Sequence, residues 1–250
     1  MKRGDFLTIS GLSAAFVLGA NAYSQKPERP NIIFFLIDDI STHELGCYGN
    51  RINPTPNIDR LAEKGIRFNS AWACPYSLPS RMQLMSGQYG YKTMRSPEPD
   101  NPLLRGVPLS MTLKMAGYST YMAGKWHLAG LPGDAGWGFD EHIVNSYLCY
   151  AACRKPEWIS RYKGHLNKQK NPGKFPPSPS FQWHPMLVKN NEFIETGPKD
   201  FGPDILSNNV ADFIRRKSAE KKPFFVYYAA GLTHAAHDSM PYPSSPTGKT

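Results

Sequence analysis

The fold of this chain is best read from residues 31–37, NIIFFLI, which lead directly into Asp38 and Asp39. The run is continuously apolar after Asn31, with no alternation of polar and apolar positions. That pattern is typical of a strand buried on both faces of a parallel sheet. Ligands of open α/β sheets gather beyond the carboxyl ends of the strands, so the two aspartates stand where a site is expected.

Helices and strands are predicted to alternate on the C-terminal side of this strand. We expect helices at residues 56–64, 79–86 and 109–116 and one opening at Asp204, and strands at residues 66–72, 118–123 and 223–228. Thr55 is expected to cap the first helix, and Gly65 to end it. Residues 130–200, rich in Pro, Gly and Lys, are expected to form a long excursion without regular elements. The alternation predicts an α/β fold with a largely parallel sheet.

Length and composition fit one large globular domain or two modest ones. The chain has 250 residues, of which 40% are hydrophobic and 20% charged, and this excludes a disordered tail or a coiled coil. No apolar run reaches the ~18 residues of a spanning helix, so no membrane span is expected. The net charge of +9 would attract a polyanion, and residues 154–174 are especially basic. No nucleic-acid-binding motif is present, so nucleic acid is not the expected partner.

The N-terminus has the pattern of a signal peptide. Lys2 and Arg3 precede an apolar segment at residues 6–19, and Ala-Asn-Ala at residues 20–22 forms a cleavage site. We therefore expect residues 1–22 to direct export to the periplasm or the medium, with an uncleaved N-terminal anchor as the alternative.

Four cysteines would permit a disulfide after export. They are Cys47, Cys74, Cys149 and Cys153, and the last two alone are closely spaced. The alternative is that they remain free or buried thiols.

Three polar groups carry candidate chemistry. Adjacent carboxylates after a buried strand suit a hard divalent cation, although one could cap a turn while the other is solvated. Ser77 stands at the start of a predicted helix, where amide dipoles favour an anion. Lys125 and His127 flank Trp126 and would point to the same side of an extended segment.

Six segments, taken in order, resemble the sulfatase family. They are Asp38-Asp39, TPNIDRL at 55–61, SLPSR at 77–81, GYSTYMAGKWHL at 117–128, GFDE at 138–141 and PFFVYYAAGLTH at 223–234. The resemblance covers most of residues 30–240. It implies the alkaline-phosphatase-like α/β sandwich, with residues 30–250 as the N-terminal part of the catalytic domain. It also implies hydrolysis of a sulfated small molecule or glycan.

The resemblance identifies Ser77 as the residue that a maturase converts to formylglycine. Leu78 departs from the small residue that is usual in the family, and Tyr76 is bulkier than usual. Cys74 lacks the x-Pro-Ser-Arg frame and is not the expected precursor. Hydrated formylglycine would attack sulfur, release the alcohol, and then expel sulfate through its second hydroxyl.

By the same resemblance, Asp38, Asp39 and the modified Ser77 bind the metal, Ca²⁺ or alternatively Mg²⁺. Arg81 holds the formylglycine oxygen and supports the charge beside the metal.

The remaining catalytic roles also come from the resemblance. Lys125 binds a sulfate oxygen, and His127 is the base that collapses the hydrated aldehyde. His234 hydrogen-bonds the sulfate or the leaving oxygen, with His237 as the competing choice.

Family members are considerably longer than this chain. They carry a later Asp-His/Asn-Gly strand end that completes the metal site, and a further Lys near the sulfate. We therefore expect the chain to be an N-terminal portion with an open sheet edge, inactive alone and prone to aggregate.

Two alternatives remain open. One is a phosphomonoester or phosphonate hydrolase of the same fold, using formylglycine or an unmodified Ser77. The other is a non-catalytic remnant that binds sulfated glycans through residues 154–174.

Overall fold

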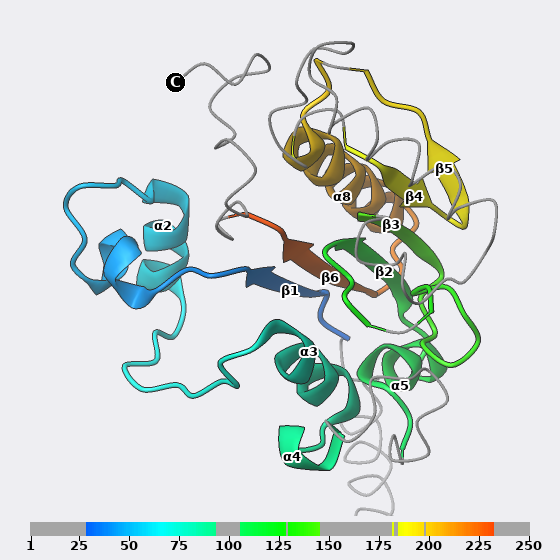
Figure 1. Ribbon diagram of the computed structural model, residues 1–250, viewed down its shortest axis with the longest axis horizontal. Helices are drawn as coiled ribbons and strands as arrows, with labels where there is room; N and C mark the ends of the chain where they lie inside the picture. Colours follow the sequence, from blue (N-terminus) through cyan, green and yellow to red (C-terminus); the bar gives the residue numbers. More distant parts are fainter. Residues whose placement is uncertain are drawn as a thin grey trace, which may run out of the picture. The chain divides into compact units, whose positions relative to one another are not determined.

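A six-stranded sheet organises the protein in the computed structural model, which describes residues 29–93, 106–128, 130–145, 182, 185–197 and 199–232 (Figure 1). In spatial order the strands are β1 (Ile32–Ile37), β6 (Phe224–Ala230), β2 (Ser119–Gly124), β3 (Glu141–Asn145), β4 (Leu187–Lys189) and β5 (Glu192–Ile194). The first four are parallel, whereas β4 runs antiparallel to both of its neighbours. The predicted α/β class with a largely parallel sheet is confirmed.

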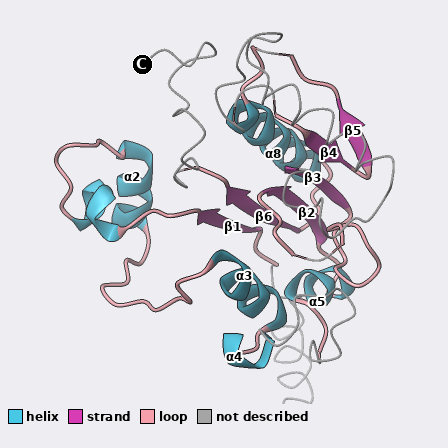
Figure 2. Ribbon diagram, viewed as in Figure 1, coloured by secondary structure: helices cyan, strands magenta, loops and turns pink. Residues whose placement is uncertain are grey.

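The described helices are α2 (Pro56–Lys64), α3 (Ser77–Ser86), α4 (Gly90–Thr93), α5 (Leu109–Met115) and α8 (Gly202–Ala219), with short 3₁₀ turns η1 (Thr42–Glu44) and η2 (Gly46–Tyr48) before α2. Of these, α3 and α5 lie on one face of the sheet and α8 lies on the other (Figure 2). Met122 and Tyr227 pack in one cluster with Met85 of α3. Tyr121 and Phe213 pack in a second cluster, on the α8 side. Since successive side chains of a strand point to opposite faces, the two clusters lie on opposite faces of the sheet.

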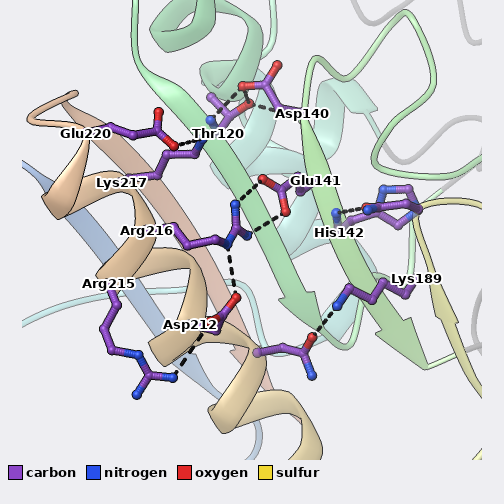
Figure 3. Close-up of polar contacts among 12 residues, drawn as sticks. Thr120, Asp140, Glu141, His142, Lys189, Asp212, Arg215, Arg216, Lys217 and Glu220 are labelled. Atoms are coloured by element: carbon purple, nitrogen blue, oxygen red, sulfur yellow. Dashed lines mark hydrogen bonds and ion pairs between the residues drawn. The ribbon is translucent and has the colours of Figure 1, made fainter.

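Polar contacts join α8 to the middle of the sheet (Figure 3). Arg216 of α8 donates hydrogen bonds of 3.1 and 2.8 Å to the two carboxylate oxygens of Glu141, the first residue of β3. Asp140 accepts a 2.9 Å bond from the backbone N–H of Thr120 and pairs with Lys114 at 2.7 Å. The GFDE segment at 138–141 therefore connects β3 to α8 and to β2, which is a structural role.

At the other end of the sheet, β1 is an edge strand of the described part of the chain. Ile33 and Phe35 lie opposite Val226 and Tyr228 of β6, and are therefore on the α8 face. They are nevertheless 54% and 51% exposed. The Ile32–Ile37 strand carries neither charge nor proline to block a further strand.

Some of the predicted helix boundaries are confirmed, and others differ in the structure. The helix at Pro56–Lys64 has the predicted bounds. The α3 helix begins at Ser77, two residues earlier than expected, and α8 begins at Gly202 rather than Asp204. Thr55 occupies the N-cap position of α2, but its hydroxyl makes no cap bond. It instead accepts a 2.8 Å bond from the backbone N–H of Gly46 and so joins the helix to the preceding turn.

The predicted strand at residues 66–72 is wrong. The segment lies in a loop, pairs with none of the six described strands, and leaves Trp72 96% exposed. An apolar run becomes a strand only where a neighbour supplies hydrogen-bond partners, and sequence periodicity does not register that requirement.

The expectation of no regular elements in residues 130–200 is also wrong, because β3, β4 and β5 lie there. Asn190 and Asn191 join β4 to β5, with φ angles of 48° and 71°. Two consecutive residues of positive φ are the signature of a type I′ hairpin turn, for which asparagine is favoured. The Asn190–Asn191 dipeptide was therefore a sequence feature that indicates a hairpin turn.

Some predictions lie outside the described residues. These are the signal peptide at residues 1–22, the basic stretch at 154–174, Cys149, Cys153, His234 and His237. Cys47 and Cys74 carry free thiols. No described helix combines the length and the apolar character that a membrane crossing requires.

Candidate active site

Asp38 and Asp39 stand at the carboxyl end of β1. The backbone N–H of Asp38 donates a 3.2 Å bond to the carbonyl of Ala230, the last residue of β6. Asp38 is buried, whereas Asp39 is exposed and has a φ angle of 58°. Asp tolerates this left-handed conformation better than most residues. The backbone turns sharply there, so the two carboxylates have different surroundings.

The carboxyl end of β2 is held against β6 by a glycine. Gly124 has a φ angle of 97°, and a Cβ there would lie 2.0 Å from the carbonyl oxygen of Ala229. That same oxygen accepts a 2.8 Å bond from the backbone N–H of Lys125. Only a residue without a side chain permits this close approach, which places Lys125 beside the end of β6.

The first turn of α3 brings Ser77 and Arg81 to the same place. They are four positions apart in the sequence, so they lie on one face of the helix, and Arg81 Nε donates a 3.0 Å bond to Ser77 Oγ. Arg81 is only 1% exposed. Its Nη1 donates a 2.6 Å bond to the backbone carbonyl of Lys125, and its Nη2 lies 3.5 Å from Asp38 Oδ1. A buried guanidinium with these partners joins the ends of β1 and β2 to α3.

Lys125 and His127 both reach this centre. The Lys125 ammonium forms an ion pair with Asp38 Oδ2. His127 has a φ angle of 53°, and its Nδ1 lies 3.0 Å from Ser77 Oγ. A hydroxyl oxygen between an imidazole and a guanidinium can exchange its proton with the first and be oriented by the second.

Tyr227 is the member of the site that the sequence did not indicate. Its hydroxyl accepts a 3.2 Å bond from Arg81 Nη1, and the side chain is fully buried. Burial raises the pKa of this hydroxyl, and the neighbouring Arg81 guanidinium opposes the rise without cancelling it. Within the apolar run of residues 223–228, nothing in the sequence distinguishes this tyrosine from its neighbour Tyr228.

The predicted metal ligands have the right donor chemistry but form a partial set. Two carboxylates and an oxygen at position 77 are the hard donors that Ca²⁺ and Mg²⁺ prefer. Among the described residues, no group of three or more His, Cys, Asp or Glu side chains gathers around a common point. Both oxygens of Asp38 also have cationic neighbours, Arg81 and Lys125.

The structure therefore brings together five of the predicted site residues, Asp38, Ser77, Arg81, Lys125 and His127. Asp39 adjoins them in the chain but turns to an exposed position. His234 and His237 lie outside the described residues.

Comparison with a family model and comparison with individual relatives lead to the same family. The family model described as Sulfatase matches residues 30–250. The N-acetylgalactosamine-6-sulfatase of Rattus norvegicus is 31% identical over 253 residues, covering 93% of this chain and 44% of the relative. The N-acetylgalactosamine-6-O-sulfatase of Bacteroides thetaiotaomicron is 30% identical, covering 92% of this chain and 53% of the relative. The chain thus spans about half the length of these relatives.

Solved structures share the same fold. A protein solved in complex with its substrate D-glucosamine-2-N,6-O-disulfate superposes with a TM-score of 0.62 and 27% identity, covering 83% of this chain and 35% of that one. The phosphonate monoester hydrolase of Agrobacterium radiobacter superposes with a TM-score of 0.51 and 19% identity, covering 83% of this chain and 42% of that one. The fold is therefore the alkaline-phosphatase-like α/β fold predicted from the sequence.

Proposed function

Because the chain belongs to the sulfatase family, we propose that the protein hydrolyses sulfate esters at the site around Ser77. The observation that carries this proposal is the placement of one oxygen, Ser77 Oγ, 3.0 Å from both Arg81 Nε and His127 Nδ1. A cationic orienting group and a proton acceptor on the same side-chain oxygen suit an activated nucleophile. Lys125 adds a second positive charge for an anionic substrate.

Position 77 is proposed to carry formylglycine, produced from serine by a maturase. The hydrated aldehyde would supply a hydroxyl nucleophile, with a second hydroxyl for regeneration. Arg81 would orient the oxygen at position 77 through its Nε–H, as it orients the serine hydroxyl. His127, whose Nδ1 lies 3.0 Å from Ser77 Oγ, would be the base that takes the proton of the second hydroxyl, so that the aldehyde re-forms and sulfate leaves.

Lys125 and the aspartates are proposed to hold the charged partners. Asp38, Asp39 and the oxygen at position 77 would hold a divalent cation, which we propose to be Ca²⁺, with Mg²⁺ as the alternative. When bound, such a cation lowers the pKa of a coordinated hydroxyl and neutralises sulfate charge. Lys125 would transfer its ammonium contact from Asp38 to a sulfate oxygen, because both groups offer an anionic oxygen to the ammonium.

A sulfated glycan is the proposed substrate class. The names of the two relatives specify the 6-sulfate of N-acetylgalactosamine, and a structural neighbour holds a disulfated glucosamine. We propose a sulfated amino sugar on these grounds. With residues 1–22 as a signal peptide, the enzyme would meet such a glycan outside the cytoplasm.

The second candidate function is hydrolysis of phosphate or phosphonate esters. The observation that favours it is the shared fold of the phosphonate monoester hydrolase. Sulfate and phosphate esters differ in charge more than in shape, so kinetics on aryl sulfate and aryl phosphate would separate the two functions.

The test begins with the mass of the tryptic peptide at residues 68–81, FNSAWACPYSLPSR, after coexpression with a serine-type maturase. Loss of two hydrogens is expected, since oxidation of serine to formylglycine removes them. Ser77→Ala should abolish the loss. Ser86→Ala, at the other end of α3, is the control and should keep it. An unchanged mass in the parent chain would contradict the formylglycine mechanism.

A further inference from the structure

Resting on the proposed function of this site, we propose that Tyr227 is a positioning residue, whose hydroxyl fixes the plane of the Arg81 guanidinium so that Nε–H points at the oxygen of residue 77. Tyr227 does not touch the reacting oxygen. It acts through Arg81, which does.

The argument begins with the hydrogen bonds of the guanidinium. A guanidinium is planar and carries five N–H donors in a fixed fork. The two Nη1 hydrogens have separate acceptors, the Lys125 carbonyl at 2.6 Å and the Tyr227 hydroxyl at 3.2 Å. Because the fork is rigid, fixing both Nη1 hydrogens also fixes the direction of Nε–H. That direction is the one that meets Ser77 Oγ.

The Tyr227 hydroxyl is a hydrogen-bond acceptor at a fixed position, because the packing around its ring restricts movement of the ring. Tyr227 lies in β6 between two parallel neighbours, opposite Phe34 of β1 and Met122 of β2. Its ring centroid lies 5.9 Å from that of Phe34, and the side chain is fully buried in the cluster beneath α3. A side chain packed on a central strand holds one rotamer, so its hydroxyl stays where the sheet places it.

Beside the Lys125 carbonyl, which holds one Nη1 hydrogen, the other two partners of Arg81 are less suited to fix the plane. Asp38 is 3.5 Å from Nη2 and also pairs with Lys125, so its carboxylate is shared. Ser77 lies on the same helix as Arg81 and is the residue being oriented. Tyr227 comes from a different element and has no role in the proposed chemistry, which is what a positioning residue requires.

The test compares two tyrosines that differ in their partners. Tyr227→Phe removes the hydroxyl and keeps the ring. Tyr121→Phe is the matched control. Tyr121 is also buried and lies on the neighbouring strand β2, and its hydroxyl has no hydrogen-bond partner in the structure as described. Each variant loses one buried oxygen, but only the first loses a bond to Arg81.

The readout is the state of Arg81 in the intact 250-residue chain, well below its unfolding temperature. The Arg81 Nε–H signal, assigned with Arg81→Lys, is followed by ¹⁵N NMR. The rate of Arg81 modification by phenylglyoxal is followed by peptide mass. In Tyr227→Phe we expect the signal to shift and the rate to rise about tenfold, since a bond to a charged donor contributes on that order. In Tyr121→Phe neither should change.

Two results would overturn the proposal. One is an unchanged Arg81 in Tyr227→Phe, even with a lowered melting temperature, which would leave Tyr227 with a packing role only. The other is an equal change in both variants. Neither readout requires turnover, so a Ser77 peptide of unchanged mass would count against the proposed function without affecting this test.

Discussion

Among single-methyl additions, Gly124→Ala is the one that we expect to disturb the site most. Gly124 ends β2 with a φ angle of 97°, and a Cβ there would lie 2.0 Å from the Ala229 carbonyl oxygen. In Gly124→Ala two costs combine. A left-handed conformation costs a residue with a side chain about 1–2 kcal/mol. The backbone contact cannot relax by a side-chain rotation, so the strand ends must separate and lose the Lys125–Ala229 hydrogen bond, about 1 kcal/mol more.

Two other glycines separate these costs. Gly87, the C-cap of α3, has a φ angle of 66° with nothing within 4 Å of an added Cβ, so Gly87→Ala carries the conformational cost alone. Gly136 also has open space and no positive φ, so Gly136→Ala should be close to neutral. We expect the free energy of unfolding to fall in the order Gly136→Ala, Gly87→Ala, Gly124→Ala, with about 2–3 kcal/mol lost in the last.

The assay is urea unfolding followed by tryptophan fluorescence, with the midpoint and the slope fitted separately. Trp126 lies two residues beyond Gly124 and is buried, so its emission also reports the local geometry. Equal losses of stability in Gly124→Ala and Gly87→Ala would refute the argument, because the contact with Ala229 would then contribute nothing.

Three further predictions follow from other parts of the sheet. Arg216→Met should lower the free energy of unfolding by about 1 kcal/mol, because it breaks the partly exposed bidentate pair with Glu141 of β3. Arg215→Met is the control: it removes one long contact of 3.8 Å with Asp212 and should change the free energy of unfolding little in the same urea assay. His142 is buried, and burial lowers its pKa to about 4. The folded state therefore binds fewer protons than the unfolded state, and the chain should lose on the order of 3 kcal/mol as the pH falls from 6.5 to 4. His142→Leu should flatten this dependence in acid titrations of stability, and an unchanged slope would contradict it. Phe35→Lys places a charge on β1, the edge strand of the described residues, and should reduce concentration-dependent association in sedimentation velocity. Ile52→Lys, at an exposed apolar residue elsewhere, tests whether any lysine would do the same.

The site depends on strand ends that are distant in sequence. Asp38 follows β1, Lys125 follows β2, and Ala230 ends β6 between them. Parallel strands bring their carboxyl ends to one edge, so polar residues placed after each strand meet there. This is why the positions of Asp38, Lys125 and His127 relative to predicted strands were sufficient to propose a common site.

The sequence-based prediction succeeded where the signal was local. The unbroken apolar run at β1 and the Pro56–Lys64 helix depend on periodicity and on proline or glycine at the ends. The prediction failed at residues 66–72, where none of the described strands pairs with the expected strand, and at β3, which is only five residues long. In both cases the outcome depended on what lies beside the segment, which no short window contains.

Residue types and spacing were thus enough to indicate the α/β class and polar clusters at strand ends, at Asp38 and at Lys125 and His127. The resemblance to the sulfatase family supplied the roles of Ser77 and Arg81. Packing alone reveals that Arg81 is buried with Tyr227 as a partner 146 residues away, and that Asp38 is shared between two cations. Such contacts follow from the register of β6 against its neighbours and from the seating of α3 on that sheet. Both depend on all the side chains buried between them.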